Sequence, residues 1–230
     1  MLTLDRLKLR QGEFALTADF SVDRGAKLAL IGPSGAGKST LIAAIAGFLA
    51  PETGRITWSG QDITGLEPGQ RPVSILFQDN NLFPHLTAFQ NAGLALRPSL
   101  RLSGAERDRV SAALSRVGLA GFEQRKPANL SGGQQGRVAL ARVLLQQNPI
   151  MLLDEPFAAL GPGLKREMLD LVTDLTDDQG ITVLMVTHNP EDALQFAQQT
   201  ILVDAGIANP PVETQALFAD PPPALKDYLK

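Results

Sequence analysis

The sequence contains no cysteine, and this absence excludes disulfide bonds and thiolate chemistry. A chain without cysteine fits a reducing compartment. The sequence also has no long run of charge of one sign, and its formal net charge is −3. Because a dedicated nucleic-acid-binding protein usually presents a basic face, this balance argues against a nucleic-acid partner.

Long hydrophobic runs are absent as well. The longest apolar run, LIAAIAGFLA at 41–50, has about half the length that a bilayer-spanning helix requires. Asp5 and Arg6 place charge too early for the apolar core of a signal peptide. We therefore expect a chain that is soluble by itself and meets a membrane only through a partner.

Several short segments have strand patterns. Residues 14–22, FALTADFSV, alternate apolar and polar side chains, which is typical of a half-buried antiparallel strand. ITW and VSILF are further strand candidates at 56–58 and 73–77. Four nearly continuous apolar runs are typical of buried parallel strands covered by helices on both faces; they lie at 28–32, 150–154, 182–188 and 200–203.

The stretch between these groups has helical patterns. Ser103 and Glu106 have the spacing of a capping box, and apolar residues follow at helical spacing to residue 118. A second helix is predicted from about Gly132 to Gln146. The order predicts one domain over 1–230, in which 1–84 and 148–230 form an α/β core with an antiparallel β part and 85–147 forms a helical insert.

The segment GPSGAGKS at 32–39 matches the phosphate-binding pattern G-x-x-x-x-G-K-[ST] between a predicted strand and a predicted helix. Its glycines let backbone N–H groups converge on phosphate oxygens, and the helix N-terminus adds a positive dipole end. Lys38 is expected to reach the β- and γ-phosphates, and the Ser39 hydroxyl to bind Mg²⁺. The predicted nucleotide-binding residues are Gly32, Pro33, Ser34, Gly35, Ala36, Gly37, Lys38, Ser39 and Thr40.

Polar side chains follow three predicted strands. Asp154 and Glu155 end the run at 150–154, where ligands bind in open α/β sheets. We expect Asp154 to hold Mg²⁺ beside Ser39, and Glu155 to orient or deprotonate the attacking water. His188 follows the next strand and would hydrogen-bond the γ-phosphate or the water, although a lone histidine is more often structural. Gln78 follows another strand, where a surface glutamine is the default interpretation.

The segment LSGGQQGR at 130–137 begins a predicted helix with two glycines, which disfavour helix by about 1 kcal/mol each relative to alanine. Ser131 and Gln134 form a second capping box, which leaves Gly132 and Gly133 unexplained. A bare helix N-terminus is a second anion site. Because one nucleotide hardly needs two such sites, we predict a twofold dimer in which this end faces the partner subunit's nucleotide.

These motifs, in this order, resemble the nucleotide-binding subunits of ABC transporters: GPSGAGKS, Gln78, LSGGQ, IMLLDE and His188. The resemblance covers the whole chain and implies a P-loop NTPase fold with a mostly parallel sheet, an N-terminal antiparallel β part and a helical insert. It also implies ATP and Mg²⁺ as cofactors, with Gln78 as both a metal ligand and a catalytic residue, and with Glu155 and His188 as further catalytic residues. The expected partners are a second copy of the chain and separate membrane permease subunits, on the cytoplasmic face of a bacterial inner membrane.

Within that family, residues 71–96 and 41–54 resemble the ATPases of bacterial thiamine importers. This implies uptake of thiamine and its phosphates, with a periplasmic binding protein as an indirect partner. In this family Leu82, Phe83, His85 and Leu86 would face the permease, and the alternative is that they pack inside the helical insert. Another small solute, such as a polyamine, iron or an anion, stays open. So do a soluble non-transport ABC ATPase, a P-loop kinase and a subunit with degraded catalysis.

Three parts of the sequence depart from the family pattern. Gly161 stands where the family usually has an aspartate that joins the two active sites. Arg10, Gln11 and Gly12 occupy the place of the aromatic residue that stacks on adenine, and Phe14, the nearest aromatic, has a core pattern. Gly136 stands in the signature helix without an evident local reason.

Overall fold

The computed structural model describes residues 1–228, which divide into two compact units. The first unit comprises residues 1–73, 149–154 and the chain from Thr176 onward. The second comprises residues 74–148 and 155–175. The second unit thus contains all of the predicted helical segment 85–147 and adds residues 74–84, 148 and 155–175 to it.

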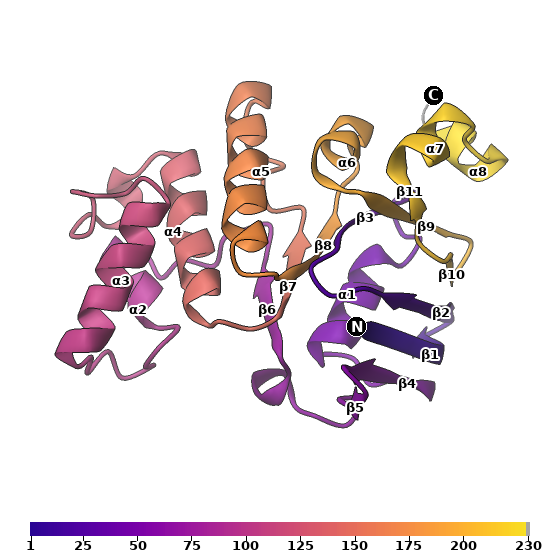
Figure 1. Cartoon of the computed structure of the whole chain (residues 1–230), viewed down its shortest axis with the longest axis horizontal. Coiled ribbons are helices and arrows are strands. Elements are labelled where there is room, and N and C mark those ends of the chain that lie inside the picture. The colour runs from indigo at the N-terminus through magenta and orange to yellow at the C-terminus, as the bar shows by residue number, and fades with distance from the viewer. Residues whose placement is uncertain (229–230) are drawn as a thin grey trace. The chain divides into compact units, whose positions relative to one another are not determined.

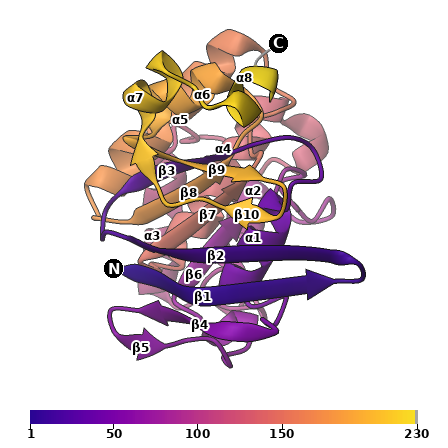
Figure 2. The ribbon, with the colours of Figure 1, turned by 90° about the vertical axis from the view of Figure 1, so that its right-hand side faces the viewer.

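The first unit begins with an antiparallel sheet, seen in Figure 2 as β2, β1, β4 and β5 in this order. Its strands are β1 (Leu2–Gln11), β2 (Phe14–Val22), β4 (Thr53–Trp58) and β5 (Gln61–Asp62). The predicted strands at 14–22 and 56–58 are confirmed. Strand β1 was not predicted because its alternation is broken: the pairing register shifts between Leu4 and Leu7, and Arg6 has a φ of 45°.

A parallel sheet forms the rest of the unit's core, with strand order β9-β3-β8-β7. Every residue of β3 and β8 is buried, which explains why these strands are apolar after their first residues, Lys27 and Thr182. The strands are β3 (Lys27–Ile31), β7 (Ile150–Asp154), β8 (Thr182–Val186) and β9 (Gln199–Asp204), all predicted from their apolar runs.

A two-residue strand, β10 (Ile207–Ala208), joins the two sheets by pairing with both β2 and β9. β11 (Val212–Glu213) pairs with β9. The helices of this unit are α1 (Lys38–Ala46), α6 (Pro190–Phe196), α7 (Thr214–Ala219) and α8 (Pro223–Tyr228). The mixed sheet with its phosphate loop confirms the predicted α/β class (Figure 1).

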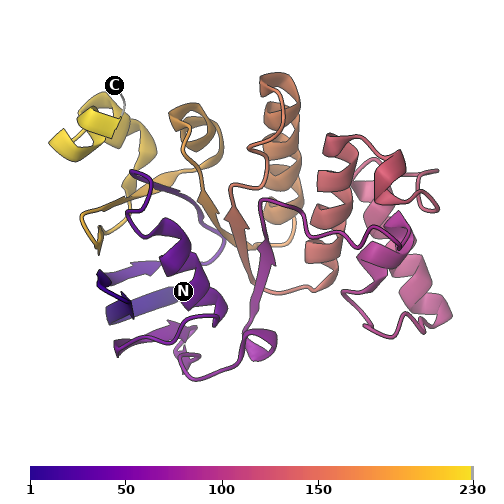
Figure 3. The ribbon, with the colours of Figure 1, turned by 180° about the vertical axis from the view of Figure 1, so that it is seen from behind.

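The second unit is helical and is entered through β6 (Val73–Leu76). Its helices are α2 (Ala88–Gly93), α3 (Gly104–Arg116), α4 (Gly132–Leu145) and most of α5 (Pro162–Asp177). Figures 1 and 3 show α2, α3 and α4 gathered together. Both predicted capping boxes are present, because Ser103 accepts from Glu106 and Ser131 accepts from Gln134. Neither α2 nor α5 was predicted from the sequence.

Candidate functional site

The phosphate-binding motif forms the loop between β3 and α1 in the first unit. Gly35 and Gly37 have φ angles of 79° and 109°, in the left-handed region that favours glycine. A Cβ atom on Gly32 would lie 1.9 Å from the carbonyl oxygen of Val203, so backbone crowding at this position requires glycine. The three motif glycines therefore serve the shape of the loop, as its backbone demands.

Lys38 is the first residue of α1, and its side chain folds back across the loop. Its ammonium group donates to the carbonyl oxygens of Gly32 at 2.6 Å and of Pro33 at 2.9 Å. Helix α1 has Gly37 at its N-cap, and no side chain caps it among the described residues. The N–H groups of its first turn are thus directed at the loop, where they can bind an anion.

Ser39 and Asp154 meet at the carboxyl edge of the parallel sheet. The hydroxyl of Ser39, in the first turn of α1, lies 3.5 Å from a carboxylate oxygen of Asp154 at the end of β7. A hydroxyl and a carboxylate oxygen are ligands that Mg²⁺ prefers. The pair is close enough for both oxygens to bind one small cation, so the donor set fits the predicted metal.

His188 lies at the same edge. It is exposed and follows β8 by two residues, and Val186 in that strand pairs with Asp154. The turn behind it is fixed by the buried Thr187, whose hydroxyl donates to Asp192 at 2.8 Å and accepts from the Asn189 N–H at 3.1 Å. Helix α6 begins directly after this turn, with Asn189 as its N-cap. The structure thus brings Ser39, Asp154 and His188 to one sheet edge.

Glu155 and Gln78 belong to the second unit. Glu155 follows Asp154 directly in the chain and has a φ of 46°, an uncommon left-handed conformation for a glutamate. Such strained residues occur disproportionately at functional sites. Gln78 is exposed and lies within the turn in which the Asn80 N–H donates to the Phe77 carbonyl oxygen at 3.0 Å.

The signature segment forms the N-terminus of α4. Ser131 is exposed and accepts from the Gln134 N–H at 3.3 Å, while the Ser131 N–H donates to the Gln134 side chain at 3.0 Å. A Cβ atom on Gly133 would lie 2.6 Å from a methyl carbon of Leu164 in α5. Packing inside the subunit therefore supplies a reason for Gly133 that the sequence analysis missed, and Gly132 has no such close neighbour.

Phe14 differs from its predicted place in the core. It is half-buried at the start of β2, and its ring edge would lie 2.7 Å from a Cβ atom on Gly37. The ring therefore packs on the phosphate loop itself. The alternating pattern of β2 could not reveal this contact, because Phe14 is the first residue of the strand.

The comparisons with known proteins agree on one family. The ABC transporter family profile matches residues 16–158. The thiamine import ATP-binding protein ThiQ of Cereibacter sphaeroides is 62% identical over 229 residues, covering 100% of this chain and 99% of its own length. ThiQ of Ruegeria sp. strain TM1040 is 57% identical with the same coverage, and ThiQ of Brucella suis biovar 1 is 49% identical over 99% of this chain and 95% of its own.

A solved structure is similar as well. It is the dimeric structure of an ATP-binding cassette in a post-hydrolysis state bound to ADP and Pi. It has a TM-score of 0.79 and 30% sequence identity, and the match covers 93% of this chain and 99% of the cassette. Within residues 1–228, no helix of this protein has the length and apolar character needed to cross a bilayer. The profile, the full-length relatives and the fold together establish that the chain belongs to the ABC transporter family.

Proposed function

We propose that this protein is the ATP-hydrolysing subunit of an importer that takes up thiamine and its phosphates through a separate membrane permease. The observation that carries the ATPase assignment is the phosphate loop. Its Lys38 and Ser39 meet Asp154 of the same chain at one edge of the sheet. The observation that carries the substrate is the identity of 62% with a thiamine import ATP-binding protein over the full chain.

In this proposal, the first unit binds the triphosphate. The backbone of residues 32–37 and the first turn of α1 receive phosphate oxygens, and Lys38 exchanges its contacts with loop carbonyls for the β- and γ-phosphates. Phe14, whose ring packs on Gly37, lies beside this cradle and offers an apolar surface next to the nucleotide. His188 hydrogen-bonds the γ-phosphate or the attacking water.

The metal would be held by oxygen atoms of Ser39 and Asp154, with Gln78 as a further ligand. When bound, Mg²⁺ neutralises charge on the phosphate oxygens. Glu155 orients the attacking water or accepts its proton, since a carboxylate is a suitable general base. The left-handed backbone conformation of Glu155 is unfavourable for a non-glycine residue, so the surrounding structure must maintain it.

The signature segment would act on the second nucleotide of a homodimer. The exposed N-terminus of α4, capped by Ser131, presents N–H groups to an anion. In a head-to-tail twofold dimer, this end would face the ATP held by the partner subunit. The related cassette of known structure is dimeric, which supports this arrangement.

The permease would meet the segment that follows Gln78. Phe83 is 48% exposed and makes an edge contact with the exposed His85, with ring centroids 6.0 Å apart. Leu82 and Leu86 are half-buried beside them. An exposed aromatic pair on an anchored segment suits a docking helix. The chain would then lie peripherally on the cytoplasmic face of the inner membrane, with a periplasmic binding protein delivering the solute on the other side.

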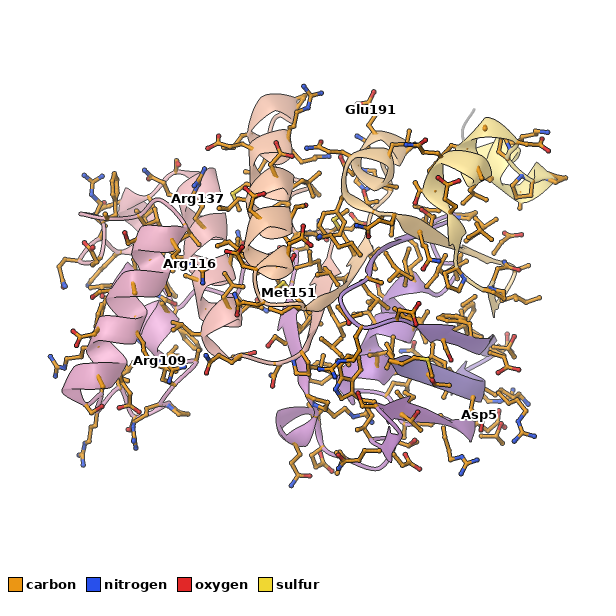
Figure 4. The ribbon with its side chains drawn as sticks, in the orientation of Figure 1. Asp5, Arg109, Arg116, Arg137, Met151 and Glu191 are labelled. Atoms are coloured by element: carbon orange, nitrogen blue, oxygen red, sulfur yellow. The ribbon has the colours of Figure 1, made fainter. Side chains whose placement is uncertain are left out.

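The ATPase assignment is tested by Glu155→Gln in the full chain. We expect a fall in ATP turnover of at least about a hundredfold, because general-base catalysis contributes about that much. ATP binding, measured by fluorescence of a nucleotide analogue, should persist. Glu191→Gln is the matched control, since Glu191 is an exposed carboxylate at the start of α6 (Figure 4). If the wild type were no faster than Glu155→Gln, the chain would be a subunit with degraded catalysis.

The dimer is tested at Gly133. Gly133→Asp puts a negative charge at the end of α4 and should abolish hydrolysis while leaving ATP binding to the isolated subunit nearly intact. Because a side chain at this position meets Leu164, the same substitution is also made together with Leu164→Ala, which clears the space. Loss of ATP binding in both variants would mean that the segment serves its own subunit.

The substrate is tested by transport. Deletion of this subunit should abolish ATP-dependent uptake of labelled thiamine, and the wild-type chain should restore uptake while Glu155→Gln should not. Undiminished thiamine uptake in the deletion strain would refute the thiamine assignment and leave the ATPase assignment standing.

A further inference from the structure

The segment between Gln78 and α2 is held by side chains from two helices of the second unit. Arg142 projects from α4, and its two terminal nitrogens donate to the backbone carbonyl oxygens of Asn80 and Asn81, each at 2.7 Å. Asn91, in α2, holds the following part of the segment. The segment has little regular structure, so these contacts define its path.

The stretch that Arg142 holds is strained. Asn80 and Asn81 have φ angles of 55° and 45°, two consecutive left-handed residues without glycine. Asparagine tolerates this conformation better than most residues, but a pair of such residues persists only where surrounding contacts fix it. The Asn80 N–H also closes the turn onto the Phe77 carbonyl oxygen, and Gln78 lies inside that turn. Arg142 therefore holds the end of the turn that carries Gln78.

The Arg142 guanidinium uses its two terminal nitrogens for these hydrogen bonds. It is half-buried, and burial lowers its pKa from the ordinary arginine value, although an arginine stays charged in a protein. No carboxylate pairs with it among the described residues. Its charge is thus compensated by two carbonyl oxygens of one turn, and charge-assisted hydrogen bonds of this kind are stronger than neutral ones.

Asn91 has no exposed surface. Its side-chain oxygen accepts from the Phe83 N–H at 2.8 Å, and its amide nitrogen donates to the carbonyl oxygens of Phe83, Leu86 and Thr87. A fully buried amide with all of its groups satisfied specifies one conformation of the chain around it. The exposed Phe83 is therefore presented from a rigid base.

We infer that Arg142 is a positioning residue that ties the Gln78 turn to the signature helix α4, so that the two move as one piece. The inference rests on the proposed function for the roles of Gln78 and the signature segment. A contact received at Phe83 would reach α2 through Asn91, and a movement of the adjoining turn would reach α4 through Arg142. Asn91 and Arg142 both lie in the second unit. A rigid movement of this unit would therefore carry Phe83, the turn and α4 together.

The test compares Arg142→Gln with Arg137→Gln in the full chain. Arg137 is a matched control because it lies on the same helix (Figure 4), donates to the Val117 carbonyl oxygen at 2.8 Å and pairs with Glu167, away from the turn. For Arg142→Gln we expect kcat for ATP to fall about tenfold while KM changes less than about threefold, since ATP binding belongs to the first unit. Arg142→Lys should recover part of kcat, because an ammonium can still donate to one of the two carbonyls.

A second readout does not depend on activity. Hydrogen exchange of the Asn80 and Asn81 amides should accelerate about tenfold in Arg142→Gln and stay unchanged in Arg137→Gln. Equal losses of kcat and of melting temperature in the two glutamine variants, or unchanged exchange at Asn80 and Asn81, would overturn the inference. If the wild type itself shows no turnover above Glu155→Gln, the proposed function fails, and the exchange measurement still decides the role of Arg142.

Discussion

Replacing Gly136 by alanine should stabilise the protein. Gly136 lies inside α4, where glycine is unfavourable because its backbone loses the most freedom on folding. A Cβ atom built on Gly136 would have its nearest neighbours at 3.8 Å, the terminal methyl of Met168, and at 3.9 Å, the side-chain oxygen of Asn80. Both distances are ordinary van der Waals contacts, so the new methyl group requires no movement.

The expected gain is the difference in helix propensity, about 0.8 to 1.0 kcal/mol in the free energy of unfolding. For a chain of this size, that gain raises the melting temperature by about 2 to 4 °C. The Gly136→Ser variant adds a further test. Its hydroxyl comes within reach of the Asn80 side-chain oxygen, which is buried and has no hydrogen-bond partner among the described residues. A new hydrogen bond would add about 1 kcal/mol and offset the poorer helix propensity of serine.

The measurement is thermal unfolding followed by circular dichroism at one protein concentration. Gly133→Ala is the control on the same helix, because its Cβ atom would lie 2.6 Å from Leu164 and the shift of that side chain consumes the gain. A melting temperature for Gly136→Ala equal to or below that of the wild type would refute the reasoning. It would mean that the space above Gly136 is needed.

Three further predictions concern other parts of the chain. Gly161→Asp should raise the melting temperature slightly and increase ATP turnover, since the Gly161 carbonyl accepts from the Lys165 N–H at the start of α5 and a Cβ atom there meets nothing within 4 Å; unchanged turnover would show that this position does not limit hydrolysis. The Ser103 N–H, and then Arg97, lower the pKa of Glu106. Glu106→Gln should therefore reduce stability above about pH 4.3, the unfolded-state value, and the difference from the wild type should vanish as pH falls through the lower folded pKa; a difference that persists at pH 2 in urea unfolding would contradict this. Lys27 is buried and pairs with Asp177, whose side chain is 60% exposed. Lys27→Met should change the free energy of unfolding by less than about 1 kcal/mol, whereas Asp177→Asn, which leaves the buried ammonium poorly paired, should lower it by about 1 to 3 kcal/mol; equal effects in urea unfolding would refute this asymmetry.

The elements that the sequence predicted are those with uninterrupted patterns. Strands β3, β7, β8 and β9 are continuous apolar runs because both of their faces are buried, and α3 and α4 begin with complete capping boxes. Strand β1 escaped because the bulge at Arg6 moves its later leucines out of register. The amphipathic pattern of α5 is present in the sequence, so this helix could have been predicted.

The residues of the candidate site also divide into those that could be predicted from the sequence and those that could not. The residues of the phosphate loop and Asp154 could be named from motif and strand order, because parallel strands bring their carboxyl ends to one edge. Leu164, which fills the space beside Gly133, could not, since nothing in a local pattern says which side chain arrives from another helix. In the sequence, Arg142 and Asn91 look like ordinary helix residues. Their roles depend on hydrogen bonds to backbone carbonyl oxygens of a loop, and the sequence pattern does not predict the path of that loop.

The pairing of β3 has a consequence for synthesis on the ribosome. The strand that carries the phosphate loop hydrogen-bonds with β8 and β9, and the N-terminal hairpin is joined to β9 by Ile207 and Ala208. All of these partners are translated last, at about 5 to 20 residues per second. The loop can be held in place only after β9 has left the exit tunnel. We therefore expect nascent or prematurely terminated chains that lack β9 to have no competent nucleotide site.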